Sequence, residues 1–264
     1  MIETRTIQAN GANLAVHQVG SGPPAMLVHG FPLDHRMWMD VLRSDLAEQR
    51  TLYAIDLRGH GQSPWAGDAV HEMDGFASDI AAVMRSLADE PFDLVGLSMG
   101  GYVAMCMAEN HAELLRSITL ADCRAGVDVP AAKEGRIASI ETVVTKGRHE
   151  LALQMLTRLV APDCPAPVRA RLQTMIEATP SETIIADQQG MLARVDRNAT
   201  LAKVKVPTLV VVGSVDLLSP PEEARSMAEQ IPDCEFQVIE GAGHMTPMES
   251  PGPFCELLGN FWKR

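Results

Sequence analysis

The segment that most constrains the fold of this chain is residues 92–101, an apolar run that leads directly into a Gly-x-Ser-x-Gly pentapeptide. The run before the pentapeptide has the pattern of a buried strand, and residues 102–110 have the pattern of a helix. Gly96 and Gly100 are the small residues that a sharp turn between a strand and a helix requires. The sequence therefore predicts an elbow that presents Ser98 to solvent at the carboxyl end of a strand.

Strand-like and helix-like segments alternate along most of the chain. The eight predicted strands are Thr4–Ile7, Leu14–Val19, Ala25–His29, Leu52–Ile55, the strand of the elbow, Ser117–Leu120, Pro207–Gly213 and Glu235–Ile239. The predicted helices are Met37–Leu46, Met73–Leu87, Tyr102–Asn110, Pro221–Gln230 and Pro253–Trp262. Strands separated by crossover helices predict an α/β fold, in which helices flank both faces of a mostly parallel sheet. The Asn10–Gly11 pair predicts a hairpin between the first two strands, so we expect the sheet to begin antiparallel.

Residues 123–201 interrupt this alternation, because no strand pattern occurs there. The segment is predicted to form several helices, with breaks at Gly147, Pro162, Pro165, Pro167 and Pro180. It is inserted between two strands, above the carboxyl ends where ligands bind to open α/β sheets. We therefore expect a core of residues 1–122 and 202–264, with residues 123–201 as a helical cap that acts as a lid. A further helical layer without a gating role is the alternative.

Composition limits the class of protein. The chain has 264 residues, 46% of them hydrophobic, which is enough to bury the core of one large domain. Five widely spaced cysteines without a C-x-x-C pair argue against a disulfide framework and against a zinc site. No signal segment or membrane-spanning apolar stretch occurs, so we expect a cytoplasmic protein with no membrane partner. A formal charge of −12 argues against nucleic acid as a partner.

A serine hydroxyl becomes an effective nucleophile when a base lies within hydrogen-bond reach and a carboxylate orients that base. His244 is the candidate base, because it lies in a glycine-rich loop directly after a predicted strand. Asp216 is the candidate carboxylate, because it follows the preceding predicted strand. Asp122 ends another strand and is a rival, but its neighbour Arg124 makes Asp216 the better candidate. The chain order serine, acid, histidine is the one expected for a nucleophile on such an elbow.

Stabilisation of a tetrahedral oxyanion requires two backbone N–H donors. The amide of Met99, at the start of the helix that follows the serine, is predicted to be one of them. The turn His29-Gly-Phe-Pro32 follows another strand, and the amide of Phe31 is predicted to be the second. His29 itself is interpreted as a buried imidazole that fixes this turn. The other histidines considered as bases are interpreted as solvated side chains: His17, His35, His71, His111 and His149.

Together these motifs resemble the α/β-hydrolase superfamily. The resemblance spans nearly the whole chain and rests on His29-Gly-Phe-Pro, Asp56-Leu-Arg-Gly-His-Gly-Gln-Ser63, Gly96-Leu-Ser-Met-Gly100, Asp216 and Gly243-His244. It implies the α/β-hydrolase fold with a helical cap, and a structural role for Arg58 and His60 beside the site. Within the superfamily the chain most resembles small carboxylesterases and 3-oxoadipate enol-lactonase-like hydrolases.

The expected activity is hydrolysis of small-to-medium, uncharged carboxylic esters through a Ser-His-Asp acyl-enzyme mechanism, with no metal or organic cofactor. An aspartate at the elbow would indicate a dehalogenase or an epoxide hydrolase, but position 98 is serine. A lactonase is the second candidate. Its anionic substrate would be repelled by the net charge unless cap arginines line the pocket, the candidates being Arg124, Arg136, Arg148 and Arg158.

The sequence is also compatible with functions other than ester hydrolysis. A ligand-binding homologue without catalytic activity belongs to a different functional class, and the fold alone does not exclude it. Acyl transfer to peroxide or another acceptor in place of hydrolysis is open as well, as is the oligomeric state. Three apolar cap residues at near-helical spacing either pack on the core or line an acyl pocket: Leu151, Met155 and Leu159.

Overall fold

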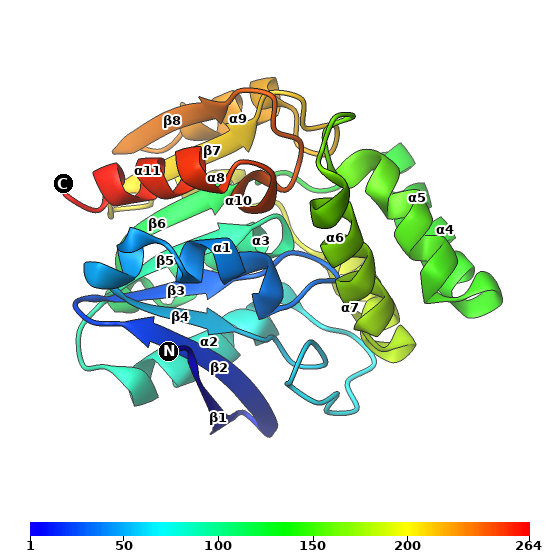
Figure 1. Cartoon of the computed structure of the whole chain (residues 1–264), viewed down its shortest axis with the longest axis horizontal. Coiled ribbons are helices and arrows are strands. Elements are labelled where there is room, and N and C mark those ends of the chain that lie inside the picture. The colour runs from blue at the N-terminus through cyan, green and yellow to red at the C-terminus, as the bar shows by residue number, and fades with distance from the viewer.

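A computed structural model describes residues 1–264, and its centre is one sheet of eight strands (Figure 1). Across the sheet the strands follow the order β1-β2-β4-β3-β5-β6-β7-β8. Their bounds are β1 Glu3–Ala9, β2 Ala12–Gly20, β3 Pro24–Val28, β4 Thr51–Ile55, β5 Phe92–Leu97, β6 Leu115–Ala121, β7 Thr208–Gly213 and β8 Cys234–Ile239. All eight predicted strands are confirmed.

The sheet begins antiparallel, as the sequence predicts. β1 and β2 are joined at Asn10 and Gly11, whose φ angles of 46° and 80° lie in the left-handed region that these two residue types adopt most easily. β2 also pairs antiparallel with β4, and every other pairing is parallel. The carboxyl ends of β3 to β8 therefore meet at one edge of the sheet.

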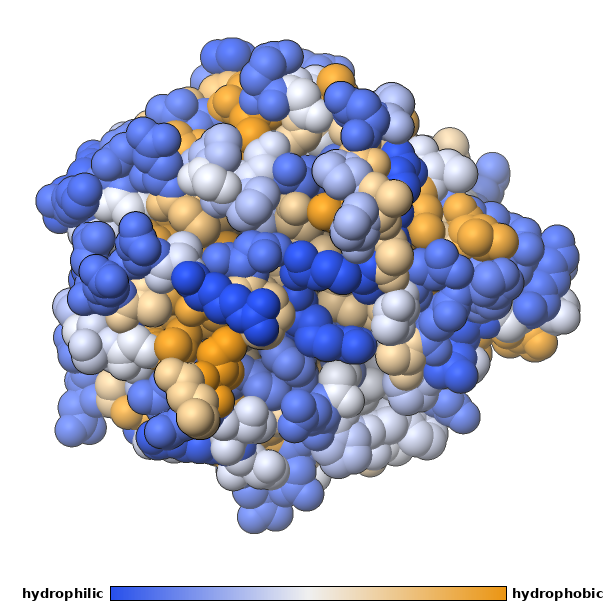
Figure 2. All heavy atoms as spheres, viewed as in Figure 1, coloured by the Kyte–Doolittle hydropathy of each residue, from blue (hydrophilic) through white to orange (hydrophobic).

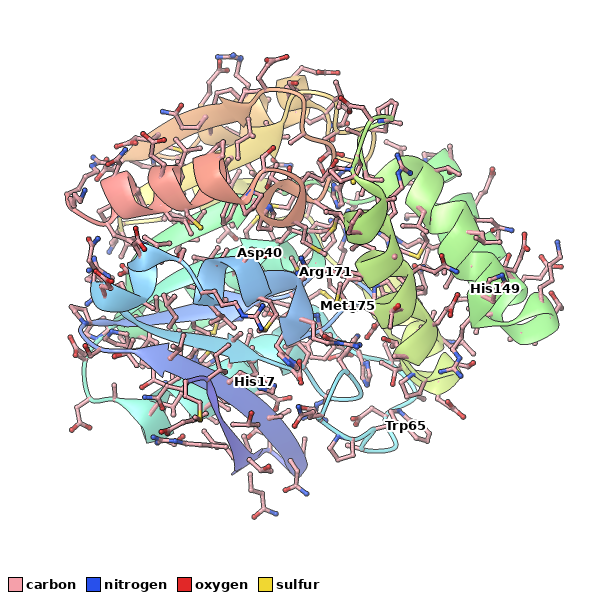
Figure 3. The ribbon with its side chains drawn as sticks, in the orientation of Figure 1. His17, Asp40, Trp65, His149, Arg171 and Met175 are labelled. Atoms are coloured by element: carbon pink, nitrogen blue, oxygen red, sulfur yellow. The ribbon has the colours of Figure 1, made fainter.

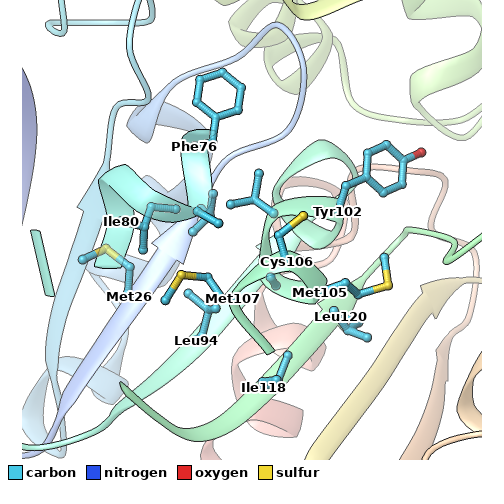
Figure 4. Close-up of a cluster of buried hydrophobic side chains, with 14 of the residues drawn as sticks. Met26, Phe76, Ile80, Leu94, Tyr102, Met105, Cys106, Met107, Ile118 and Leu120 are labelled. Carbon is cyan, nitrogen blue, oxygen red and sulfur yellow. The ribbon is translucent and has the colours of Figure 1, made fainter. Parts of the chain in front are cut away.

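Helices cover both faces of the sheet, which is why all six residues of β5 are buried. On one face α2 (Met73–Leu87), α3 (Met99–Asn110) and α9 (Pro221–Ala228) contribute to one hydrophobic core. Figure 4 shows part of this core, with side chains of α2 and α3 packed over those of β3, β5 and β6. On the other face α1 (Met39–Leu42) and α11 (Pro251–Phe261) contribute to a second core.

The single helix expected over residues 37–46 is wrong. The chain instead forms a 3-10 turn at His35–Trp38, the short helix α1 (Met39–Leu42) and another 3-10 turn at Asp45–Glu48. Ser44 separates the last two, because its hydroxyl accepts a hydrogen bond from the backbone amide two residues later. A serine that bonds to nearby backbone in this way begins a new turn and ends the previous helix.

Residues 123–201 contain helices and loops but no strand, in agreement with the sequence. The helices are α4 Pro130–Lys146, α5 Arg148–Leu159, α6 Ala166–Ala178, α7 Ser181–Ala193 and α8 Asn198–Leu201. Breaks fall at four of the five predicted residues: Gly147 caps α4 with a φ of 86°, Pro162 and Pro165 lie in the loop before α6, and Pro180 precedes α7. The break expected at Pro167 is wrong, because this proline is the second residue of α6, where its missing N–H costs no helix hydrogen bond. In Figure 1, α4 to α7 form one group at the side of the sheet, with α6 and α7 nearer to it.

The surface is mostly hydrophilic on the face shown in Figure 2, where apolar atoms occur in separate spots. None of the helices combines the length and the apolar character that crossing a membrane requires. Five cysteines occur in the chain and all are free.

Candidate active site

Ser98 lies at the elbow between β5 and α3. Its φ of 55° and ψ of −111° are a strained conformation for a residue with a side chain. The residues on either side, Leu97 and Met99, are fully buried, whereas Ser98 is half-buried. The flanking glycines are required, because a Cβ at Gly96 would collide with the backbone of Gly100. The elbow therefore projects the serine side chain out of a closely packed turn.

His244 lies in the loop that follows β8, and this loop brings the imidazole to the serine. The Nε2 atom of His244 is 2.8 Å from the Oγ atom of Ser98. On the other side of the ring, Nδ1 is 2.8 Å from the Oδ2 atom of Asp216. Both His244 and Asp216 are about 3% exposed. Three side chains distant in the sequence thus form one continuous chain of hydrogen bonds.

Asp216 is itself held in place by the backbone. Its second oxygen, Oδ1, accepts hydrogen bonds from the amides of Leu218 at 2.7 Å and Ser219 at 3.0 Å. An imidazole whose Nδ1–H donates to a carboxylate presents a lone pair at Nε2. His244 is therefore oriented to accept the hydroxyl proton of Ser98.

A second buried carboxylate, Asp122, lies close to Asp216 but does not contact the imidazole. It accepts hydrogen bonds from the amide of Gly213 and from the hydroxyl of Thr246. Burial, together with the nearby charge of Asp216, raises the pKa of Asp122 well above 3.8. Arg124, whose closeness in the sequence counted against Asp122, pairs with Glu223.

The turn at residues 29–32 lies against the elbow. A Cβ added to Gly30 would be 3.4 Å from the Cβ of Ser98, so the backbone on either side of Gly30 passes directly beside the serine. Phe31, whose amide is the predicted second donor, follows Gly30 directly, and Met99, which carries the first predicted donor, is the first residue of α3. Amides in the first turn of a helix have no partner within that helix and are available to bind an anion.

His29 fixes this turn, as the sequence predicts. Its Nε2 accepts a hydrogen bond from the amide of Leu57 at 3.0 Å, and its Nδ1 donates to the carbonyl of Gly30 at 3.0 Å. Burial, with the nearby His60, lowers the pKa of His29 to about 4. His29 is therefore a neutral structural imidazole at neutral pH.

His17 is buried and His35 is mostly buried, whereas both were expected to be solvated. Their rings stack with centroids 3.4 Å apart, and both lie within hydrogen-bond distance of Asp56, at 3.1 Å and 2.9 Å. Burial would raise the pKa of Asp56, but the hydrogen bonds from both imidazoles outweigh it and hold this pKa far below 3.8. These three groups are close enough to hold a metal ion, yet each ligand atom already takes part in a hydrogen bond. We interpret them as the support of a buried carboxylate.

His71 is also buried, and it belongs to a cluster that joins α7 to the loop between β4 and α2. Asp187 of α7 bonds to His60 at 2.9 Å and to His71 at 2.7 Å, and none of the three side chains is exposed. The structural role expected for His60 is therefore confirmed. Of the remaining histidines, His149 is exposed on α5 (Figure 3) and His111 is half-buried.

A cavity of about 210 Å³ lies beside α3. Tyr102, Cys106 and Arg194 are among the residues that line it, and the guanidinium of Arg194 stacks 4.3 Å above the ring of Tyr102. Burial raises the pKa of the Cys106 thiol to about 12, so this thiol is protonated at neutral pH. None of the three residues of the Ser98 hydrogen-bond chain lines this cavity.

Two side chains near the site were not found from the sequence. Thr179, at the end of α6, donates from its hydroxyl to the carbonyl of Pro32 at 2.8 Å, and so ties the 123–201 segment to the turn beside Ser98. Glu249 accepts three hydrogen bonds around His244. Both act on backbone groups, and no residue pattern in a single sequence indicates such partners.

A parallel sheet with an antiparallel start, carrying a serine on a strand–helix elbow within reach of a histidine, defines the α/β-hydrolase class. Residues 25–257 match the alpha/beta hydrolase family, and the chain belongs to that family. Among solved structures, the chain is similar to a thermophilic esterase from Thermogutta terrifontis, determined with malate bound. The two are 36% identical, the match covers 99% of this chain and 98% of the other, and the TM-score is 0.93.

Curated relatives extend this similarity. The pimeloyl-[acyl-carrier protein] methyl ester esterase of Aeromonas hydrophila is 27% identical over 94% of this chain and 99% of its own length. The 3-oxoadipate enol-lactonase 1 of Acinetobacter baylyi is 26% identical over 99% of this chain and 94% of its own. The expected superfamily and the expected resemblance to esterases and enol-lactonases are confirmed.

Proposed function

We propose that this chain is a serine esterase that hydrolyses small-to-medium, uncharged carboxylic esters. The observation that carries the proposal is the pair of 2.8 Å hydrogen bonds that His244 makes with Ser98 and Asp216. In this assignment Ser98 is the nucleophile, His244 is the general base and Asp216 orients the imidazole. None of the steps below requires a metal or an organic cofactor.

Acylation begins when the Ser98 oxygen attacks the ester carbonyl carbon while Nε2 of His244 takes the hydroxyl proton. The amides of Phe31 and Met99 donate hydrogen bonds to the oxyanion that forms, and Asp216 stabilises the imidazolium. The C–O bond to the alcohol then breaks, and His244 gives its proton to the leaving oxygen. Water repeats the sequence on the acyl-serine, releases the acid and restores the serine.

Charge supports an uncharged substrate. The protein carries a formal charge of −12, which disfavours the approach of anions. Three of the four arginines considered for an anionic ligand are already engaged: Arg124 with Glu223, Arg136 with Asp128, and Arg148 with backbone carbonyls. The fourth, Arg158, lies exposed near the end of α5.

The acyl pocket suggested by three apolar residues of α5 has no support. Leu151 and Leu159 are buried in the second core, and Met155 packs against it. We therefore assign these residues to packing.

A lactonase is the second candidate, because the enol-lactonase of Acinetobacter baylyi matches nearly the whole chain. Lactone opening would use the same residues, with the leaving alcohol still attached to the acyl group. A binding-only role is less well supported, since it would not need an oriented serine, imidazole and carboxylate.

We also propose that residues 123–201 form a cap over a core of residues 1–122 and 202–264. The insertion of helices alone between β6 and β7, with a hydrogen bond from Thr179 to the turn at Pro32, supports this division. The free state of all five cysteines supports a cytoplasmic location.

Hydrolysis of p-nitrophenyl acetate, butyrate and octanoate, with one anionic lactone alongside, tests the function. We expect turnover of the esters, and a loss of at least about 10⁴-fold in kcat for Ser98→Ala. Ser139→Ala, on the exposed face of α4, is the matched control and should retain wild-type rates. Activity that survives in Ser98→Ala would refute the nucleophile, and turnover of the lactone alone would favour the second candidate.

A further inference from the structure

The loop that carries His244 is held by one carboxylate. Glu249, the last residue of α10 (Thr246–Glu249), accepts through its Oε1 atom from the amide of Gly243 at 3.1 Å and from that of Met245 at 3.0 Å. These two amides flank His244 on either side. A charged acceptor shared by both neighbours fixes the backbone between them and therefore the direction in which the imidazole leaves it.

The second oxygen of the same carboxylate reaches the cap. The Oε2 atom of Glu249 accepts from the amide of Ala161 at 2.7 Å, just after α5. The amide of His244 in turn donates to the carbonyl of Leu159 at 3.0 Å. A Cβ at Gly243 would lie 2.6 Å from the nitrogen of Ala161, so the two backbones are in direct contact and only glycine fits.

We propose that Glu249 is a positioning residue that couples the placement of the cap to the orientation of His244. The inference rests on the proposed function, because it treats His244 as the base. Since residues 159–161 are bonded to the histidine loop from both directions, this part of the cap belongs to the fixed wall of the site. Movement of the cap to admit substrate then takes place in its other helices.

The kinetic test compares Glu249→Ala and Glu249→Gln with Glu256→Ala, an exposed glutamate on the neighbouring helix α11. Small misplacements of a catalytic group cost about 10²-fold in rate, so we expect kcat for p-nitrophenyl acetate to fall about 10- to 100-fold in Glu249→Ala. KM should stay within about two-fold, because the substrate is not contacted. Glutamine has one carbonyl oxygen and can accept from either the loop amides or the amide of Ala161. The kcat of Glu249→Gln should therefore lie between those of wild type and Glu249→Ala.

A second measurement does not depend on turnover. The Nδ1 proton of His244 lies in the 2.8 Å hydrogen bond to Asp216, so we expect it to give a low-field proton NMR signal that reports the orientation of the imidazole. We expect this signal to broaden or disappear in Glu249→Ala and to persist in Glu256→Ala. If the wild-type protein lacks esterase activity, the proposed function fails. The NMR signal then still tests whether Glu249 positions the imidazole of His244. A lower Tm with wild-type kcat and an unchanged signal, in either Glu249 variant, would overturn the inference.

Discussion

At the scale of single residues, the site contains two buried carboxylates with different tasks. Asp216 contacts the imidazole, whereas Asp122 contacts the backbone of Gly213 and the hydroxyl of Thr246. We expect Asp216→Asn to lower kcat for p-nitrophenyl acetate by about 10³- to 10⁴-fold, because it removes the acceptor that sets the imidazole tautomer. Asp122→Asn should change kcat by less than about ten-fold. A greater loss in Asp122→Asn would reverse the assignment of the acid.

Asp122 is also expected to affect how the stability of the protein depends on pH. Burial, together with the charge of Asp216, raises the pKa of Asp122, so the folded protein holds this proton more tightly than the unfolded chain does. The free energy of unfolding that depends on this group therefore falls as the pH rises above about 3.8. Asparagine resembles the protonated acid, so Asp122→Asn should raise Tm relative to wild type by more at pH 8 than at pH 5. Asp163→Asn, in an exposed loop, should show no such trend.

The residues of the site could be predicted from the sequence where they directly follow a strand. Ser98, Asp216 and His244 each follow a strand, and the ends of parallel strands meet at one edge of a sheet. Glu249 could not be predicted, because its partners are backbone amides from two distant segments. The burial of His17 was missed for a related reason. His17 lies on β2, whereas its partner Asp56 follows β4, which is distant in the sequence.

At the scale of elements, α7 joins the proposed cap to the core through Asp187. Burial would raise the pKa of Asp187, but His60 and His71 outweigh it and hold this pKa below 3.8. Burial would likewise lower the pKa of His60, but Asp187 outweighs it and raises this pKa above 6.5. Between pH 3.8 and pH 6.5, Asp187 and His60 therefore both carry their charges in the folded protein. The stabilisation from this charged pair is lost at low pH as Asp187 protonates, and at high pH as His60 deprotonates.

Asp187→Asn is expected to lower the free energy of unfolding by about 3 kcal/mol at pH 6, since it leaves the charged imidazole of His60 buried without its counter-charge. The loss in Tm should be larger at pH 6 than at pH 9, because the charge on His60 is lost as the pH rises through its raised pKa. Thermal unfolding at both pH values provides the measurement. Glu177→Gln removes the exposed partner of His149 and should leave Tm unchanged at either pH. An equal loss in Tm at pH 6 and pH 9 would mean that the charge on His60 does not contribute to the stability that Asp187 provides.

Element boundaries were predictable where a residue forces them. Gly147 and the prolines before α6 and α7 mark helix ends by their backbone geometry, and the apolar run of β5 marks a strand covered on both faces. The region at 37–46 was mispredicted because its apolar spacing suits a helix while Ser44 supplies a local hydrogen bond that stops one. The periodicity of apolar residues does not reveal whether the helical spacing or the local hydrogen bond of Ser44 determines the backbone.

At the scale of the whole molecule, alternation of strands and helices predicts a covered parallel sheet but not the order of its strands. The position of β4 between β2 and β3 depends on crossover connections, and these depend on how helices pack on the finished sheet. The net charge, by contrast, follows directly from the sequence and acts on every ligand that approaches.

That charge leads to a prediction about substrate choice. A formal charge of −12 should repel an anionic ester over distances that salt controls, because the Debye length falls from about 30 Å at 0.01 M to about 8 Å at 0.15 M. We expect kcat/KM for mono-p-nitrophenyl succinate to rise about three- to ten-fold over this range of sodium chloride, and that for p-nitrophenyl acetate to change by less than about two-fold. Both esters release the same alcohol, so the comparison isolates the charge of the acyl group. A kcat/KM for the succinate that falls with salt would show that basic side chains govern its approach, and would favour the anionic lactone as the substrate.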